Sequence, residues 1–229
     1  MSHGPTIHLH PTAPLSERVL LPGDPGRALA MAQALLEEPR MFNHHRGLWG
    51  YTGGAPDGGT LTIQATGMGG PSAAIVLTEL IALGARRAIR VGTCGALDAG
   101  LTLGQLVIAE EAICADGTSR ALGAGDRVSA DAHISEALVA HATGARAGAV
   151  VSVDLFYESE SRRAHPGALA VEMEAAALFA VGADHGIPVG CALVVSDTFD
   201  DDGARCRIED DRLVESVERM GAAALAALS

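Results

Sequence analysis

The sequence predicts an α/β protein with a mixed or parallel central sheet. Strand-like and helix-like runs alternate from residue 18 to the end of the chain, as in proteins whose sheet is flanked by helices. Aromatic residues make up only 3% of the 229 residues, so small apolar side chains must fill the core. Neither a Pro/Ser-rich linker nor an internal repeat interrupts the alternation, so we expect residues 1–229 to form one domain.

Local signals define each element in the first part of the chain. A short apolar run predicts a buried strand over residues 18–21, followed by a helix over 26–36. The alternating segment TLTIQAT predicts a strand over 60–66. The apolar run after Pro71, a residue favoured at the first position of a helix, predicts a helix over 72–83.

The rest of the chain continues this alternation. Apolar runs predict strands over 88–91, 105–112, 147–153 and 189–195. Longer runs predict helices over 130–141, 173–185 and 212–228. Because ligands of such sheets bind beyond the carboxyl ends of the strands, we expect functional residues directly after strands.

Charge and cysteine content exclude several classes of function. The formal net charge of -12 disfavours nucleic acid or an anionic membrane as the main partner, since both bind basic surfaces. The four cysteines form no CxxC pair, so we expect no metal site and reduced thiols, as in a cytoplasmic protein. We expect neither a signal peptide, because the N-terminal residues lack an apolar segment, nor a membrane span, because no apolar run is long enough.

The segment LLPGDPGR indicates an anion site at the start of the first helix. Gly23 lets the backbone approach a ligand closely, and Asp24 is placed to cap the helix. Arg27 lies in the first turn, where its charge opposes the helix dipole unless the side chain faces a bound oxyanion. The alternative is an ordinary capped helix with a solvated arginine.

The segment RVGTCGA indicates a second anion-binding element. Arg90 lies inside an apolar strand, where a charge is unfavourable unless it is paired; the alternative is a side chain that points outward. Thr93 lies between Gly92 and Gly95, so its hydroxyl is expected to donate to an oxyanion from a turn. A rival hypothesis makes Cys94 a nucleophile, but alanine stands where the nucleophile-elbow pattern requires a second glycine.

Two further segments carry carboxylates. In VEMEAAAL, Glu172 and Glu174 flank Met173 at the start of an expected helix, where a carboxylate either complements the helix dipole or accepts two bonds from a sugar diol. In VVSDT, Ser196 and Asp197 end an apolar strand. The alternatives there are a plain turn and an acid that partial burial keeps in its proton-donating form.

Taken together, these segments resemble the nucleoside phosphorylase-I family, in particular the hexameric bacterial-type purine nucleoside phosphorylases and then the uridine phosphorylases. The resemblance covers nearly the whole chain and depends on the succession GDPGR, HRGLWGYTG, GMGGPSAAI, RVGTCGA, DLFY, VEMEAAAL and VSDT. It implies a three-layer α/β/α fold with a twisted mixed sheet. It also implies a homohexamer built as a trimer of dimers, in which paired subunits share their sites.

The resemblance also implies roles for individual residues. Phosphate, a co-substrate, would contact Gly23, Arg27, Arg90, Thr93 and, from the neighbouring subunit, Arg46. The ribose would contact Met173, Glu174 and the neighbouring subunit's own copy of His8. The base would contact Phe156, Glu172, Ser196 and Arg162, with Asp197 as the general acid. No cofactor or metal is implied.

Several alternatives stay open at the level of sequence. A uridine phosphorylase would read uracil at positions 160 and 162, where Arg162 fits but Glu160 would repel the carbonyl. This mismatch, together with Asp197, favours purines. A nucleosidase would need no arginine clamp, and a silent nucleoside-binding protein would show no turnover. An arginine that approaches Asp197 would be Arg205, Arg207 or Arg212.

Overall fold

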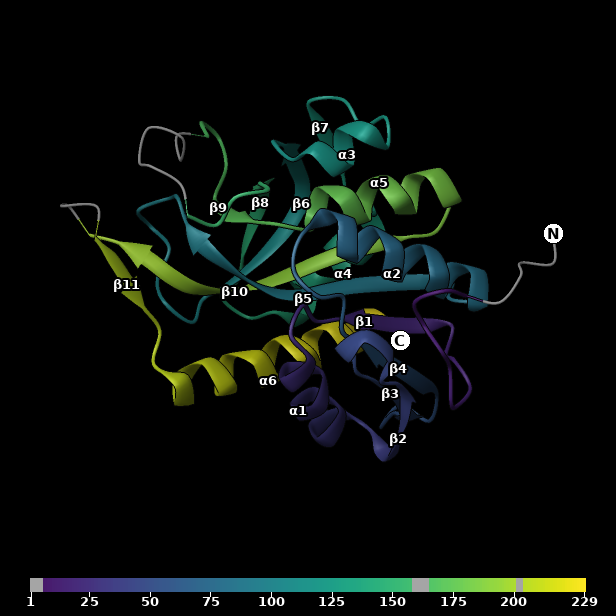
Figure 1. Ribbon diagram of the computed structural model, residues 1–229. Coiled ribbons are helices and arrows are strands. Elements are labelled where there is room, and N and C mark those ends of the chain that lie inside the picture. The colour runs from purple at the N-terminus through teal and green to yellow at the C-terminus, as the bar shows by residue number, and fades with distance from the viewer. Residues whose placement is uncertain (1–5, 158–164, 201–203) are drawn as a thin grey trace.

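The computed structural model describes residues 6–157, 165–200 and 204–229, and in these residues the strands join into one twisted sheet with helices on both faces (Figure 1). The strands are β1 (Arg18–Leu21), β2 (Glu37–Asn43), β3 (Gly50–Gly54), β4 (Thr60–Gln64), β5 (Arg87–Ala96), β6 (Leu106–Cys114), β7 (Arg127–Ser129), β8 (Arg146–Ser152), β9 (Ala170–Glu172), β10 (Val189–Phe199) and β11 (Arg205–Arg207). The helices are α1 (Pro25–Leu35), the 3-10 turn η1 (His45–Gly47), α2 (Gly70–Leu83), α3 (Gly117–Ala121), α4 (Ala132–His141), α5 (Ala175–His185) and α6 (Asp210–Ala227).

Part of the sheet closes into a ring of five strands. β10 pairs with β5 in parallel and with β6 in antiparallel orientation. β6 and β8 are parallel, as are β8 and β9, and β9 returns to β5 in antiparallel orientation. From β5 the sheet continues through β1, β4 and β3 to β2. Because β1, β5 and β10 are parallel, their carboxyl ends lie at the same edge of the sheet.

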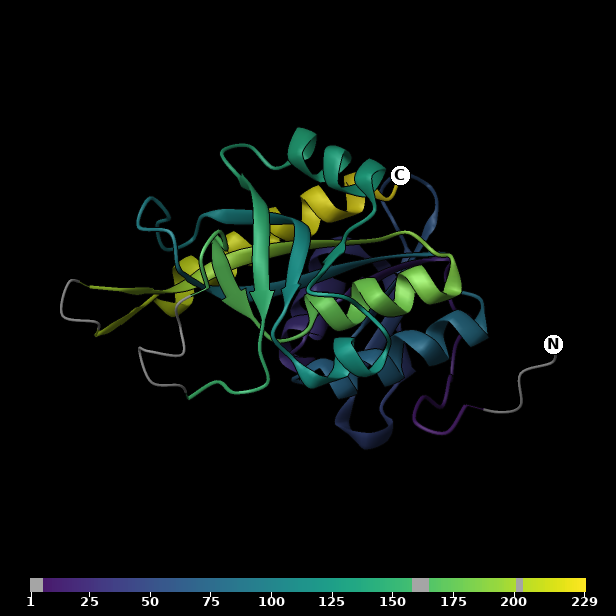
Figure 2. The ribbon, with the colours of Figure 1, turned by 90° about the horizontal axis from the view of Figure 1, so that it is seen from above.

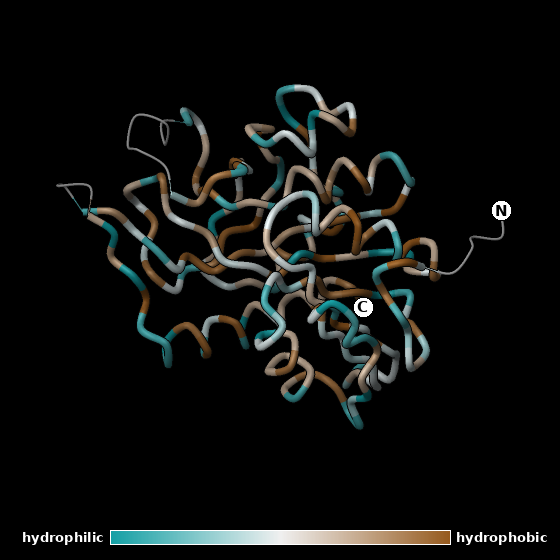
Figure 3. The backbone as a smooth tube through the Cα atoms, viewed as in Figure 1, coloured by the Kyte–Doolittle hydropathy of each residue, from teal (hydrophilic) through white to brown (hydrophobic). Residues whose placement is uncertain are grey.

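Two apolar cores lie between the sheet and the helices on its two faces. This arrangement confirms the predicted α/β class with a mixed sheet. One core contains buried side chains of α2 and α5, and the other those of α1, α4 and α6. Figure 2 shows α4 beside α6, on the opposite side of the sheet from α5 and α2. In Figure 3 the hydrophilic stretches gather at turns and at the outer ends of elements. No helix among the described residues is long and apolar enough to cross a membrane.

The predicted elements are present, but two strands extend well past their predicted ends, whereas the other strand ends differ by at most two residues. β5 does not stop at Val91: it continues to Ala96, so Thr93 lies in a strand and not in a turn. β10 likewise continues past Val195 to Phe199, with a bulge between Val195 and Asp197. Pairing with β9 and β11 supplies the extra backbone hydrogen bonds, and this pairing is invisible in the local sequence.

Five helices start one or two residues away from the predicted positions, and one of these differences changes the site. We expected a helix from Met173, but α5 begins at Ala175, with Glu174 in the capping position and Glu172 in β9. The two carboxylates therefore do not share a first helical turn. The short elements β2, β3, β7, β9, β11 and α3 were not predicted, because their apolar patterns are too short to read.

Candidate active site

A pocket of about 410 Å³ opens at the edge of the sheet where β1, β5 and β10 end. Ten of the residues that we predicted as site residues line it. They are Gly23, Arg27, Arg90, Thr93, Phe156, Glu172, Met173, Glu174, Ser196 and Asp197. The strand ends thus bring together Gly23 and Asp197, which lie 174 positions apart in the chain.

The start of α1 forms one wall of the pocket. Asp24 caps the helix, as predicted: its Oδ1 accepts the Arg27 amide at 2.7 Å. Gly23 lies beside the neighbouring turn, where an added Cβ would stand 3.4 Å from the carbonyl oxygen of Gly67. Burial, opposed by the Asp24 carboxylate, lowers the pKa of the Arg27 guanidinium below its ordinary value. A bound anion would offset this desolvation.

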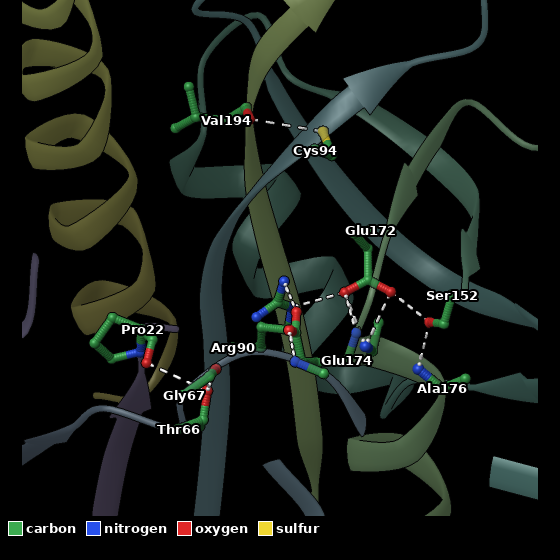
Figure 4. A network of polar contacts seen from close by, with 12 residues as sticks. Pro22, Thr66, Gly67, Arg90, Cys94, Ser152, Glu172, Glu174, Ala176 and Val194 are labelled. Atoms are coloured by element: carbon green, nitrogen blue, oxygen red, sulfur yellow. Dashed lines mark hydrogen bonds and ion pairs between the residues drawn. The ribbon is translucent and has the colours of Figure 1, made fainter. Parts of the chain in front are cut away.

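Arg90 points inward from β5, and two carboxylates hold it (Figure 4). Its Nε donates to Glu172 Oε2 at 2.9 Å, and its Nη2 lies 2.5 Å from Glu174 Oε2. Burial disfavours the charge, but Glu174 and Glu172 raise the pKa of the guanidinium above its ordinary value. Gly92 makes room for this arrangement, because a Cβ there would stand 2.8 Å from Arg90 Cζ. The predicted alternative of an outward arginine is therefore wrong.

Glu172 is the most fully bonded acid of the pocket. Its carboxylate accepts the amides of Glu174 and Ala175 at 2.8–3.0 Å, as well as Arg90 Nε and the Ser152 hydroxyl. The same hydroxyl oxygen accepts the Ala176 amide at 2.9 Å (Figure 4). Burial raises the pKa of the Glu172 carboxyl above its ordinary value. Glu172 therefore couples the start of α5 to Arg90.

Asp197 lies on the last part of β10 and lines the same pocket as the two arginines. The Ser196 hydroxyl donates to its Oδ2 at 2.6 Å. Arg205 on β11 approaches its Oδ1, with Nε at 4.0 Å. Of the three arginines that the sequence left open, Arg205 is thus the one that the structure pairs with Asp197, although Arg207 also lines the pocket.

Aromatic rings lie at the mouth of the pocket. Phe156 is 48% exposed, and the Arg205 guanidinium lies over its ring at 4.5 Å. The Phe199 ring is 5.8 Å from the same guanidinium. Such an arrangement provides flat apolar surfaces for a planar ligand. Phe199 was missed from the sequence, although an aromatic residue two positions after Asp197 could have indicated it.

Three buried polar atoms of this pocket have no hydrogen-bond partner among the described residues. They are Arg27 Nη1, Arg90 Nη1 and Asp197 Oδ1. Buried polar atoms in folded proteins are nearly always bonded, so exceptions that share one pocket indicate a ligand. Two guanidinium nitrogens require an acceptor, and an anion is the strongest. The carboxyl oxygen requires a donor or offers a proton.

Comparison with known proteins places this chain in a family. A family profile described as "Phosphorylase superfamily" matches residues 17–229. The chain belongs to the phosphorylase superfamily. It is 37% identical to the DeoD-type purine nucleoside phosphorylase of Geobacillus kaustophilus, over 81% of this chain and 83% of the relative. It is 38% identical to the protein of the same name from Alkaliphilus metalliredigens, over 81% and 84%.

Not every predicted site residue of this phosphorylase-superfamily chain lines the pocket. His8 and Arg46 are outside the residues that line it. Arg162 lies outside the described residues. The cysteine-hydrolase hypothesis loses its chemical basis, because burial raises the pKa of the Cys94 thiol and so disfavours the thiolate nucleophile. The Cys94 thiol instead contacts the carbonyl oxygen of Val194, at 3.7 Å (Figure 4).

Proposed function

We propose that this protein catalyses the phosphorolysis of purine ribonucleosides and deoxyribonucleosides, giving the free base and ribose or deoxyribose 1-phosphate. The observation that carries the proposal is a set of buried atoms in one pocket that have no hydrogen-bond partner among the described residues: two guanidinium nitrogens and one carboxyl oxygen. The names of the two relatives described above support the purine assignment over uridine.

The geometry suits a phosphate at the arginine end of the pocket. Arg27 and Arg90 offer their unpartnered nitrogens, and Gly23 and Thr93 line the same space. Two cations beside a glycine turn and a helix N-terminus form a favourable environment for a doubly charged oxyanion. This phosphate attacks the anomeric carbon while stabilising the positive charge that develops on the sugar.

Glu174 and Met173 are placed to hold the sugar between phosphate and base. Glu174 Oε1 accepts the Gly69 amide at 2.5 Å, and its Oε2 pairs with Arg90, so the carboxylate is fixed in place. A carboxylate has further lone pairs with which it accepts the two vicinal hydroxyls of a ribose. Because Glu174 also contacts Arg90, sugar and phosphate are positioned by one network.

Asp197 is the proposed general acid. As the glycosidic C–N bond breaks, its electron pair passes to the base, and a proton from Asp197 to N7 of the purine neutralises the developing charge. A positioned acid of this kind contributes about 10²- to 10⁴-fold. Arg205, near Asp197 Oδ1, stabilises the carboxylate left behind, while Phe156 and Ser196 contact the base. Glu172 acts on the base side only indirectly, through its bonds to Arg90 and α5.

A second copy of the chain completes the proposed site. Arg46 is exposed, and its backbone is left-handed with a φ of 60°, a conformation that costs a non-glycine residue about 1–3 kcal/mol. Exposed apolar side chains accompany this segment and the face of α2: Ile7 is 74% exposed, Trp49 40% and Ile75 40%. We expect a partner to cover this surface and to receive His8 and Arg46, within a hexamer built from three such dimers.

Base release from a panel of inosine, guanosine, adenosine and uridine, each with and without phosphate, tests the proposal. We expect phosphate-dependent release from the purine nucleosides. Equal release without phosphate would identify a nucleosidase, and preference for uridine a uridine phosphorylase. We place the enzyme in the cytoplasm, since its four cysteines are free thiols, which suits a reducing compartment.

A further inference from the structure

One carboxylate holds the N-terminal segment against α2. Glu79 accepts the amides of Ile7 at 3.1 Å, of His8 at 3.0 Å and of Leu9 at 2.7 Å. Its side chain is only 14% exposed. Burial acts to raise the pKa of the Glu79 carboxyl, but the bonds from His8 and from these amides outweigh it and lower the pKa. Glu79 is therefore an ionised carboxylate, and its hydrogen bonds hold residues 7–9 in place.

The same carboxylate sets the state of the His8 ring. Glu79 Oε1 lies 2.7 Å from His8 Nδ1. An ionised carboxylate only accepts hydrogen bonds, so Nδ1 must carry a hydrogen. In the neutral ring the second nitrogen, Nε2, is then an acceptor. Without such a fixed partner, the ring would exchange between tautomers and would offer Nε2 as a donor part of the time.

His8 and Arg46 belong to one connected block. His45 Nδ1 lies 3.0 Å from the carbonyl oxygen of His8, and the His45 ring stacks on His10 with centroids 3.8 Å apart. Asn43 Oδ1 accepts the His10 amide at 2.8 Å. Arg46 directly follows His45. The two side chains that we place in the neighbouring subunit's pocket, those of His8 and Arg46, therefore extend from the same connected block.

We propose that Glu79 is a positioning residue: it orients His8 and fixes Nε2 as an acceptor for the 5′-hydroxyl of the nucleoside bound in the neighbouring subunit. The inference rests on the proposed function. An Nε2 acceptor on His8 makes the site specific for nucleosides whose 5′ group donates a hydrogen bond. Glu79 contacts no substrate itself and acts through His8.

The test compares, at pH 8, inosine with 5′-deoxy-5′-fluoroinosine, whose 5′ substituent accepts but cannot donate a hydrogen bond. Glu79→Gln replaces one acceptor oxygen by an amide group, which would donate to Nδ1 and reverse the tautomer. The wild type should prefer inosine about tenfold in kcat/KM, as expected for one hydrogen bond of about 1.4 kcal/mol. In Glu79→Gln this preference should fall to about twofold or less.

A second variant makes the test independent of how well Glu79→Gln folds. His8→Ala leaves the three amide bonds to Glu79 possible and should abolish the preference for inosine. In the double variant, Glu79→Gln should then have no further effect on the ratio, as expected for two residues that act through one contact. The matched control is Glu136→Gln, at an exposed position of α4, which should keep the wild-type ratio.

Several outcomes would overturn the inference. Equal losses on both substrates in Glu79→Gln would show a purely structural role, and an unchanged ratio in His8→Ala would show that His8 does not contact the 5′ position. Failure of the proposed function is distinguishable, because the wild type would then release no base from either nucleoside in the presence of phosphate.

Discussion

Replacing Glu172 by glutamine removes a negative charge from the centre of the pocket while keeping the side chain's shape. In the wild type, Oε2 accepts Arg90 Nε at 2.9 Å and the amides of Glu174 and Ala175 at 2.8 and 2.9 Å. If the amide oxygen of the glutamine takes this place, the three bonds remain but lose their charge. The new NH₂ group then faces the Ser152 hydroxyl and the Ala175 amide, which is a second donor.

The expected loss of stability follows from these contacts. Hydrogen bonds to charged groups contribute roughly 1.5–3 kcal/mol, against about 1 kcal/mol for neutral ones. Three weakened bonds, each losing about 0.5–2 kcal/mol, amount to about 1.5–6 kcal/mol. This loss is partly offset because a neutral amide is buried at a lower desolvation penalty than a carboxylate. A net loss of about 2 kcal/mol corresponds to a decrease in Tm of about 4–8 °C for a chain of this size.

We expect the substitution to weaken the binding of phosphate. Arg90 would keep only Glu174 as a charged partner, so its guanidinium should turn away from the position in which it faces the anion. We expect the KM for phosphate to rise about tenfold, or about 1.4 kcal/mol, with a smaller change in the KM for inosine. Glu110→Gln, at an exposed position of β6, is the control. Wild-type Tm and phosphate KM in Glu172→Gln would refute the reasoning.

Three further predictions concern other parts of the molecule. Asp197→Asn should reduce kcat for inosine and adenosine by about 10²- to 10⁴-fold, and unchanged turnover would exclude Asp197 as the general acid. Gly92→Ala brings a Cβ to 2.8 Å from Arg90 Cζ and should raise the KM for phosphate at least about tenfold in steady-state assays; an unaltered KM would contradict this. The hydrogen bond from Arg18 lowers the pKa of Asp57, so its stabilising effect is present above pH ~4 and lost as the pH falls toward the folded-state value. Urea unfolding of Asp57→Asn at pH 7, 5 and 3 should therefore approach the wild type only at the lowest pH.

The sequence was sufficient for the class of fold and for most of the pocket. The strand, turn and capped helix around Asp24 were predicted from local signals alone. The local pattern left the direction of the Arg90 side chain open, and the family resemblance assigned it to the pocket, where the structure pairs it with two carboxylates. Asp197 was predicted because polar residues after a buried strand lie where ligands bind.

Other features depend on contacts that no local pattern records. The continuation of β5 past Gly92 follows from pairing with β9 and β10, which are remote in sequence. Which arginine contacts Asp197 depends on β11, which pairs with β10 in antiparallel orientation. In this register the backbone of Arg207 lies opposite Asp197, but it is the side chain of Arg205 that reaches both Asp197 and the Phe156 ring. The contact between Glu79 and His8 joins residues 71 positions apart and was not predicted at all.

The closure of β5, β10, β6, β8 and β9 into a ring has a mechanical consequence. A strand in an open sheet shifts its register by breaking bonds with one or two neighbours, but in a closed ring any slip must propagate around the whole circuit. The distance between Arg90 on β5 and Asp197 on β10 is thus fixed when the ring of strands forms, before a ligand binds. Amide protons of these strands should be among the slowest in the protein to exchange with solvent.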